Sequence, residues 1–311
     1  MTGARRGAAL LALLLCAGSP AAAYDPALAM RLDAVVQSYA TKGEFSGAVL
    51  VVRDGTVLFD KAYGMADVAA GIPNQPSTSF HVGTLSMQYT AVAILHLVET
   101  HHLALDNTAD QFVPGAPHVT MQGLLAVAPY APDAPGDYEL LARVAQAAMA
   151  DSFADIEDAA AFDSVWMYGT GLDDGTPSAE SRIARGYALA DGSLKPVSAD
   201  WAALTGAASA YTTTRDELYF LDRFFGGALV SAAAREAMPG AQAGYGWNHD
   251  SPAGQDTYWA AGAAPGFASF VLRRGGLTVI VLANIQDAQA RVIGNGLAAA
   301  LVAPATGAGK P

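Results

Sequence analysis

The chain has 311 residues, 52% of them hydrophobic, and carries 17 basic against 29 acidic side chains, a formal charge of −12. This length and apolar content allow a large core in one compact unit. So acidic a surface disfavours nucleic acid and anionic lipid, and we expect neither as a partner. The single cysteine, Cys16, lies in the first segment, so the remainder has no thiol for a disulfide, a nucleophile or a soft metal.

The first 23 residues have the pattern of a secretory signal peptide. Arg5 and Arg6 supply its positive start, residues 8–15 its apolar centre, and residues 21–23 a small-residue cleavage site. The apolar run is too short to span a bilayer, so we expect a removed signal and no stable membrane anchor. Removal leaves 15 basic against 29 acidic residues, a charge of −14. We therefore expect an exported protein, periplasmic or secreted.

The elements that follow begin with a helix over 27–40, which has apolar residues at helical spacing. Two β-branched runs, 47–53 and 56–63, flank Asp54-Gly55, a strong signal for a tight hairpin. A second apolar helix is expected over 90–99.

Near the end of the chain, residues 267–273 and 277–284 predict another hairpin, with its turn at Gly275-Gly276. An Ala-rich helix over 288–301 follows. Strands and helices at both ends around a middle of helices and loops predict an α+β fold, with helices on both faces of an antiparallel sheet and an inserted subdomain.

The most informative run is 80–91, which reads FHVGTLSMQYTA. It resembles the start of the catalytic helix in serine β-lactamases and penicillin-binding proteins, F-x-[IV]-G-S-x-S-K-x-[FY]-T-A. In that family the first Ser is the nucleophile, and the Lys one turn later helps to take its proton. Thr84 stands at the Ser position and Met87 at the Lys position.

The resemblance, which is to the class C β-lactamase-related family, extends from about Asp25 to about Leu301. It is carried by several segments in the family's order, namely 47–64, 97–114, Gly186-Tyr187, 206–218, 264–267 and 279–284. The resemblance implies the β-lactamase/DD-peptidase fold.

The implied domain covers 24–303, with sheet parts over about 24–80 and 200–303 and a helical or loop part over about 81–199. The family's H-T-S-G block after the first helices is missing, so the inserted helical subdomain looks shortened. The tail, 304–311, is small and polar and is expected to be disordered.

The family's other two motifs are also altered. The tyrosine of its Y-x-N proton shuttle falls on Asp133, with Pro135 at the third position. Its [HK]-x-G strand motif falls on Ala260 and Gly262, which keeps the glycine and loses the cation. Tyr130 is an alternative occupant of the shuttle's space, although a loop aromatic is the simpler interpretation.

Thr84 keeps a hydroxyl, but its extra methyl crowds attack, and threonine often simply opens a helix. Met87 cannot accept a proton at neutral pH, and core filling is its simplest role. Ser86 lies about 200° around the helix from Thr84, so we interpret it as structural. We therefore assign no catalytic residue and name only the family-equivalent positions.

The binding candidates are Thr84 and three aromatic residues, Tyr130, Tyr211 and Trp247. Each aromatic is more often a core or loop residue. His96, His101 and His102 lack the spacing that places two imidazoles on one helix face, so no metal is expected. No cofactor is expected either.

Loss at all three motifs favours an exported pseudoenzyme that binds a peptide, a cell-wall fragment or a protein partner. Two alternatives remain. One is a weak esterase, amidase or peptidase that uses Thr84. The other is a regulatory or structural subunit of an active relative.

Overall fold

The computed structural model describes residues 25–129, 131, 133–163, 166–175, 183–236 and 243–302. The expected signal peptide, the tail 304–311 and Tyr130 lie outside the described residues, so what was expected of them stays a prediction.

The helices are set by clear local signals. Asp25 caps the first one, and its carboxylate accepts the backbone N–H groups of Ala27 and Leu28. The α-helices are α1 (Pro26–Ala40), α2 (Met87–Glu99), α3 (Met121–Leu125), α4 (Ala134–Met149), α5 (Phe153–Glu157), α7 (Thr214–Gly226), α8 (Ala232–Glu236) and α9 (Ala290–Ala300). The 3₁₀ turns are η1 (Gly83–Ser86), η2 (Ala109–Gln111), η5 (Ala202–Leu204) and η6 (Pro252–Gly254), and η3 (Asp158–Phe162) is a π-helical turn.

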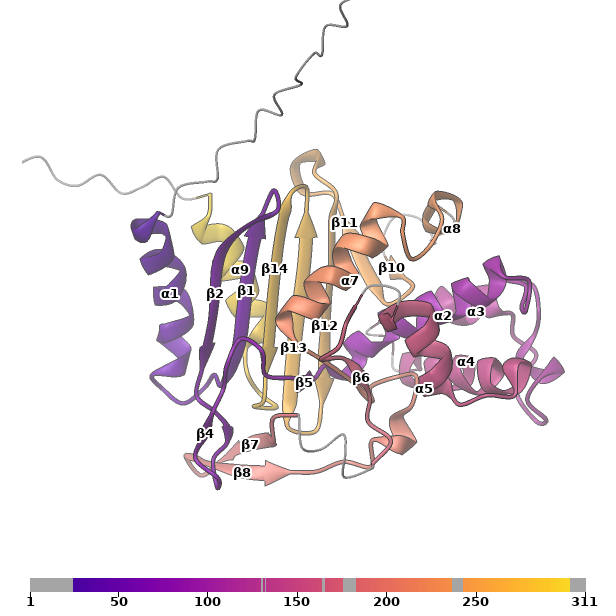
Figure 1. Cartoon of the computed structure of the whole chain (residues 1–311), viewed down its shortest axis with the longest axis horizontal. Coiled ribbons are helices and arrows are strands. Elements are labelled where there is room, and N and C mark those ends of the chain that lie inside the picture. The colour runs from indigo at the N-terminus through magenta and orange to yellow at the C-terminus, as the bar shows by residue number, and fades with distance from the viewer. Residues whose placement is uncertain are drawn as a thin grey trace, which may run out of the picture.

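In the described residues the centre is a seven-stranded antiparallel sheet with the order β10-β11-β12-β13-β14-β1-β2 (Figure 1). Its strands are β1 (Gly47–Arg53), β2 (Thr56–Tyr63), β10 (Ala243–Gly244), β11 (Trp247–Asp250), β12 (Thr257–Ala264), β13 (Phe267–Arg274) and β14 (Leu277–Ala283). The shorter strands are β3 (Met65–Asp67), β4 (Ile72–Pro73), β5 (Phe80–His81), β6 (Gly171–Leu172), β7 (Gly186–Ala190), β8 (Ser193–Val197) and β9 (Ala210–Thr212).

The central strands β1, β13 and β14 are buried on both faces. On β1, Ala48 and Leu50 join the core on the inner face, while Val49 and Val51 join a second core on the outer face. Helices α1 and α9 cover the outer face, and α7 packs on the inner face with the other helices beyond it (Figure 1). A strand buried on both sides needs no polar alternation, which explains the unbroken apolar run of β1.

Two small hairpins lie at one end of the sheet (Figure 1). Strands β3 and β4 form one, and β7 and β8 form the other; we call them the two ribbons. Strand β9 pairs with both β5 and β6 in a small three-stranded sheet, and β5 leads into η1.

The predicted fold class is confirmed: an antiparallel sheet is flanked by helices, and both expected hairpins form with their turns where predicted. The N-terminal helix begins one residue earlier than expected, at Pro26, and the last helix covers Ala290–Ala300 within the expected 288–301. The finer division into sheet and helical parts stays a prediction. Among the described residues, no helix has the length and apolar content needed to cross a membrane.

Candidate functional site

The candidate site lies where β5 leads through η1 into α2. Thr84 is in η1, and the buried Ser86 closes the turn: its hydroxyl donates to the carbonyl oxygen of Gly83 at 2.7 Å and accepts the N–H of Ala210 at 3.2 Å. Ser86 therefore ties the helix start to β9, which fits the structural role expected for it.

Strand β12 packs directly on this helix start. A Cβ atom on Gly262 would lie 1.9 Å from the carbonyl oxygen of Val82, and one on Gly83 would lie 2.5 Å from the carbonyl carbon of Ala263. Gly83 also has a positive φ of 58°. Both motif glycines are therefore required by packing alone, whatever chemistry the site performs.

Thr84 is partly exposed, and its hydroxyl donates to the carbonyl oxygen of Ala261 at 3.4 Å. No titratable side chain among the described residues hydrogen-bonds to that hydroxyl. Met87, one turn later, is 0% exposed and belongs to the inner core. The thioether fills space where the family has an ammonium group.

Two buried polar side chains of α2 contact buried carboxyls from α7 and α5, and we call these four residues the polar cluster. The hydroxyl of Tyr89 donates to the carboxyl of Glu217, and the hydroxyl of Thr90 donates to the carbonyl oxygen of Gly206 at 2.7 Å and to Glu157 at 3.3 Å. Burial raises the pKa of the Glu217 carboxyl to about 7 and raises that of Glu157 well above its ordinary range. The Tyr-Thr pair of the motif thus anchors α2 to its neighbours.

The positions of the other two motifs carry no acid–base pair. Asp133 is exposed at the start of α4, and Pro135 lies in the first turn of that helix. Ala260 is 1% exposed and packs in the inner core, where the family places a cation.

Among the aromatic candidates, Trp247 must be corrected. Its side chain is 1% exposed and packs against Phe224 and Phe225, with ring centroids 6.0 and 5.3 Å away, so it is a core residue and presents no surface to a ligand. Tyr211 is partly buried on β9, with its ring edge-on to His81 at 6.2 Å. Tyr130 lies outside the described residues.

The structure brings together a pair that sequence reasoning missed. Nε2 of His81 lies 3.1 Å from Oδ2 of Asp173, and both side chains are buried. Burial lowers the pKa of His81. Although burial alone would raise the pKa of Asp173, hydrogen bonds from His81 and the N–H of Gly175 bring it below its usual value. A neutral imidazole therefore donates to an ionised carboxylate.

The geometry of the helix start and the order of the sheet agree with comparisons to known proteins. The family model described as Beta-lactamase matches residues 32–303, and the chain belongs to this family. Over 88 residues it is 38% identical to esterase EstB of Burkholderia gladioli, a match that covers 28% of this chain and 22% of that protein. Over 96 residues it is 29% identical to penicillin-binding protein 4* of Bacillus subtilis, covering 30% of this chain and 21% of that protein.

These curated relatives are matched over less than a quarter of their own length. Similarity to solved structures extends much further. FmtA from Staphylococcus aureus has a TM-score of 0.74 at 18% identity, with 91% of each chain covered. A class C beta lactamase from Rhodobacter sphaeroides has a TM-score of 0.72 at 18% identity, covering 88% of this chain and 99% of that one. At such identities the likeness establishes the fold.

Proposed function

We propose that this chain is an exported, non-catalytic member of the beta-lactamase family, which acts by binding a peptide, a cell-wall fragment or a protein partner. The observation that carries the proposal is Met87, fully buried at the position of the family's lysine. Its neighbour Thr84 donates its hydroxyl hydrogen to a backbone carbonyl.

The energetic argument concerns proton transfer. A hydroxyl must lose its proton to attack an ester or amide, and a positioned base is typically worth about 10²–10⁴-fold in rate. A thioether cannot take that proton. The buried Ala260 also provides no charge for a substrate carboxylate.

The survival of the surrounding motif supports the proposal, because it has a structural cause. Gly83 and Gly262 are needed where β12 meets the helix start, and Tyr89 and Thr90 are needed inside α2. Selection for folding alone would keep these residues after catalysis had been lost.

The test is covalent labelling of the protein spanning 24–311 with a fluorescent penicillin, together with turnover of a chromogenic cephalosporin. We expect no adduct by intact mass and no hydrolysis above that of Thr84→Ala. A covalent adduct, or turnover that Thr84→Ala removes, would refute the non-catalytic assignment. An active class C enzyme serves as the positive control.

A second candidate is a weak hydrolase that uses Thr84. It is favoured by the partly exposed side chain of Thr84 and by the resemblance to a protein named as an esterase. It predicts slow cleavage of p-nitrophenyl acetate that disappears in Thr84→Ala. Cleavage that persists in that variant would exclude Thr84 as the nucleophile.

A further inference from the structure

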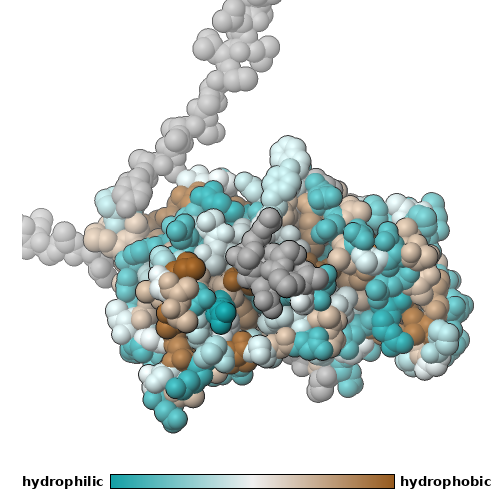
Figure 2. Space-filling view, turned by 60° about the horizontal axis from the view of Figure 1, so that its bottom comes forward, coloured by the Kyte–Doolittle hydropathy of each residue, from teal (hydrophilic) through white to brown (hydrophobic). Residues whose placement is uncertain are grey.

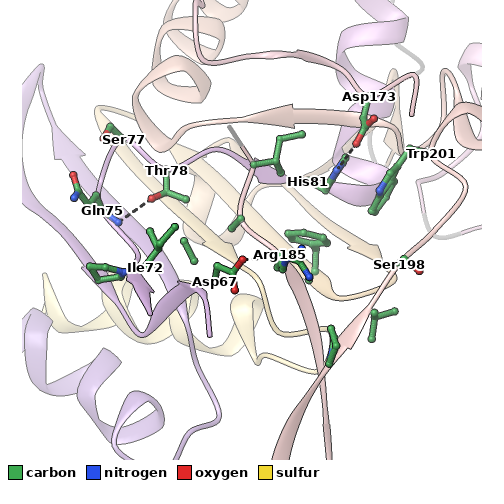
Figure 3. A pocket seen from close by; sticks show the side chains of 18 residues that line it. Asp67, Ile72, Gln75, Ser77, Thr78, His81, Asp173, Arg185, Ser198 and Trp201 are labelled. Carbon is green, nitrogen blue, oxygen red and sulfur yellow. Dashed lines mark hydrogen bonds and ion pairs between the residues drawn. The ribbon is translucent and has the colours of Figure 1, made fainter. Parts of the chain in front are cut away.

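A cavity of about 860 Å³ lies between the two ribbons at one end of the sheet (Figure 3). We call it the ribbon cavity. Residues of β3, β4, β5 and β8 line it, together with 183–186 and Trp201. Thr84, Met87 and Ala260 are not among the lining residues, although His81 of the run 80–91 is, so the cavity adjoins the helix start without including the three altered positions. Its volume falls within the ~300–1,000 Å³ usual for ligand pockets.

One wall of the ribbon cavity is a fixed aromatic surface. The ring of Trp201 stacks on His81 with centroids 3.6 Å apart and planes 7° apart, and Phe267 lies edge-on to both rings. Asp173 holds the imidazole at its edge, through Nε2. Trp201 is partly exposed and lines the cavity, and a tryptophan held in this way has little entropy left to lose on binding.

The rest of the lining mixes polar and apolar side chains. Figure 3 shows Asp67 and Arg185 in the middle, with Gln75 and Thr78 on one side and Trp201 on the other. Nε of Arg185 lies 3.1 Å from Oδ2 of Asp67. Eight of the eighteen lining residues have polar or charged side chains, and a purely apolar ligand such as an acyl chain would leave these groups unpaired. Figure 2 views this end of the molecule, where hydrophilic and hydrophobic side chains are interspersed.

The charges of the lining narrow the class of ligand further. Asp67 and Arg185 cancel each other, and the neutral His81 leaves the carboxylate of Asp173 uncompensated. The chain as a whole carries −12. This balance of charge favours neutral or amino-bearing ligands over phosphate and carboxylate ligands.

We infer that the ribbon cavity binds a short oligosaccharide built of neutral or amino sugars. A pyranose ring has one apolar C–H face, which packs on the indole of Trp201, and a rim of hydroxyls that both donate and accept hydrogen bonds. Gln75, Thr78 and the Asp67–Arg185 pair offer complementary acceptors and donors. Because none of Thr84, Met87 and Ala260 lines the cavity, the inference stands whether or not the chain is catalytic.

Isothermal titration calorimetry on the 24–311 protein tests the inference. The probes are the N-acetylglucosamine trimer, the glucosamine trimer, trialanine, decanoate and inorganic phosphate. We expect both sugars to bind and the other three to give no heat of binding. Binding of trialanine, decanoate or phosphate without sugar binding would overturn the inference, as would the absence of any binding.

Single substitutions test whether the sugar binds in the ribbon cavity. Trp201→Ala should weaken sugar binding at least about tenfold, and Gln75→Ala, an exposed change that spares the core, about fivefold, as expected for one hydrogen bond. Trp166→Ala is the matched control, because this tryptophan is 67% exposed outside the ribbon cavity. Sugar binding that is lost in Trp166→Ala, or that is unchanged in Gln75→Ala, would place the sugar elsewhere and overturn the inference.

Discussion

At position 87 a buried thioether takes the place of an ammonium group, and this single residue changes what the helix start can do. Met87 packs in the inner core with no exposed surface. An ammonium group in that space would need nearby acceptors and a compensating charge. The partly exposed Thr84 donates to a backbone carbonyl and supplies no charge. Apolar packing of Met87, and no charged group, therefore fills the space beside Thr84 at the start of α2.

Reintroducing the lysine tests this description. We expect Met87→Lys to lower the free energy of unfolding by roughly 2–4 kcal/mol, because it buries an uncompensated charge. Met87→Leu keeps the volume apolar and should cost less than about 1.5 kcal/mol. Urea denaturation followed by circular dichroism measures both. Equal stability of the lysine and leucine variants would show that the position is not closed to charge.

The buried carboxyl of Glu217 in the polar cluster predicts that the stability of the folded protein depends on pH. Burial raises the pKa of Glu217 from 4.5 to about 7, so the folded protein keeps a proton that the unfolded chain releases. The protonated carboxyl of Glu217 contributes fully to the free energy of unfolding below pH 4.5, and this contribution falls as the pH rises to about 7. At ~1.4 kcal/mol per pH unit, the loss amounts to roughly 3 kcal/mol.

Glu217→Gln should remove that part of the pH dependence. Between pH 4.5 and 7.5, the stability of the variant relative to the natural protein should rise by roughly 3 kcal/mol. The exposed Asp287→Asn is the control and should leave the slope unchanged. Parallel pH profiles for Glu217→Gln and the natural protein, from urea melts, would contradict the assignment.

At the scale of elements, the contact between β12 and η1 depends on glycine. Gly262→Ala would bring a methyl group 1.9 Å from the carbonyl oxygen of Val82, where neither backbone can move easily. We expect a loss of about 3 kcal/mol or more in stability. Gly136→Ala, in α4 with open space around its Cβ, should be neutral or stabilising by up to ~1 kcal/mol. Thermal melts compare the two, and equal midpoints would argue against a close contact at Gly262.

The terminal elements could be predicted from the sequence because their signals are local. Asp54-Gly55 sets one hairpin, Gly275-Gly276 the other, and the strands beside them are continuous apolar runs. The middle was harder to predict. Helix α4 begins just after Asp133, in a region where the family's motif is interrupted and local patterning gives no register.

At the scale of the whole molecule, the sheet joins segments from opposite ends of the chain. Strand β1 pairs with β14, with Val49 opposite Val281, so the central pairing forms only when both ends are present. The same long-range folding explains which site residues escaped prediction. His81 and Asp173 are far apart in sequence and meet only through β5, β9 and β6, so no spacing motif signals their pairing.

This arrangement makes α9 indispensable. Removing it would uncover the outer face of β13 and β14, including Phe270, Val279 and Val281. We expect a chain that ends at Gln289 to be insoluble or to lack cooperative unfolding. A chain that ends at Ala303 should melt like the full protein. Soluble yield and calorimetry compare them, and a cooperative melt of the shorter chain would contradict this role of α9.

Helix α1 begins and α9 ends at the same end of the sheet, opposite the two ribbons (Figure 1). A tether or a fused domain attached beside either helix would therefore leave the ribbon cavity pointing away from its anchorage. Immobilised on a sensor chip through Pro26, the molecule would present that cavity to the flowing solution, unobstructed by the support. The same orientation would suit a domain attached to a larger assembly, because the end with the two ribbons would then face the soluble molecules around it.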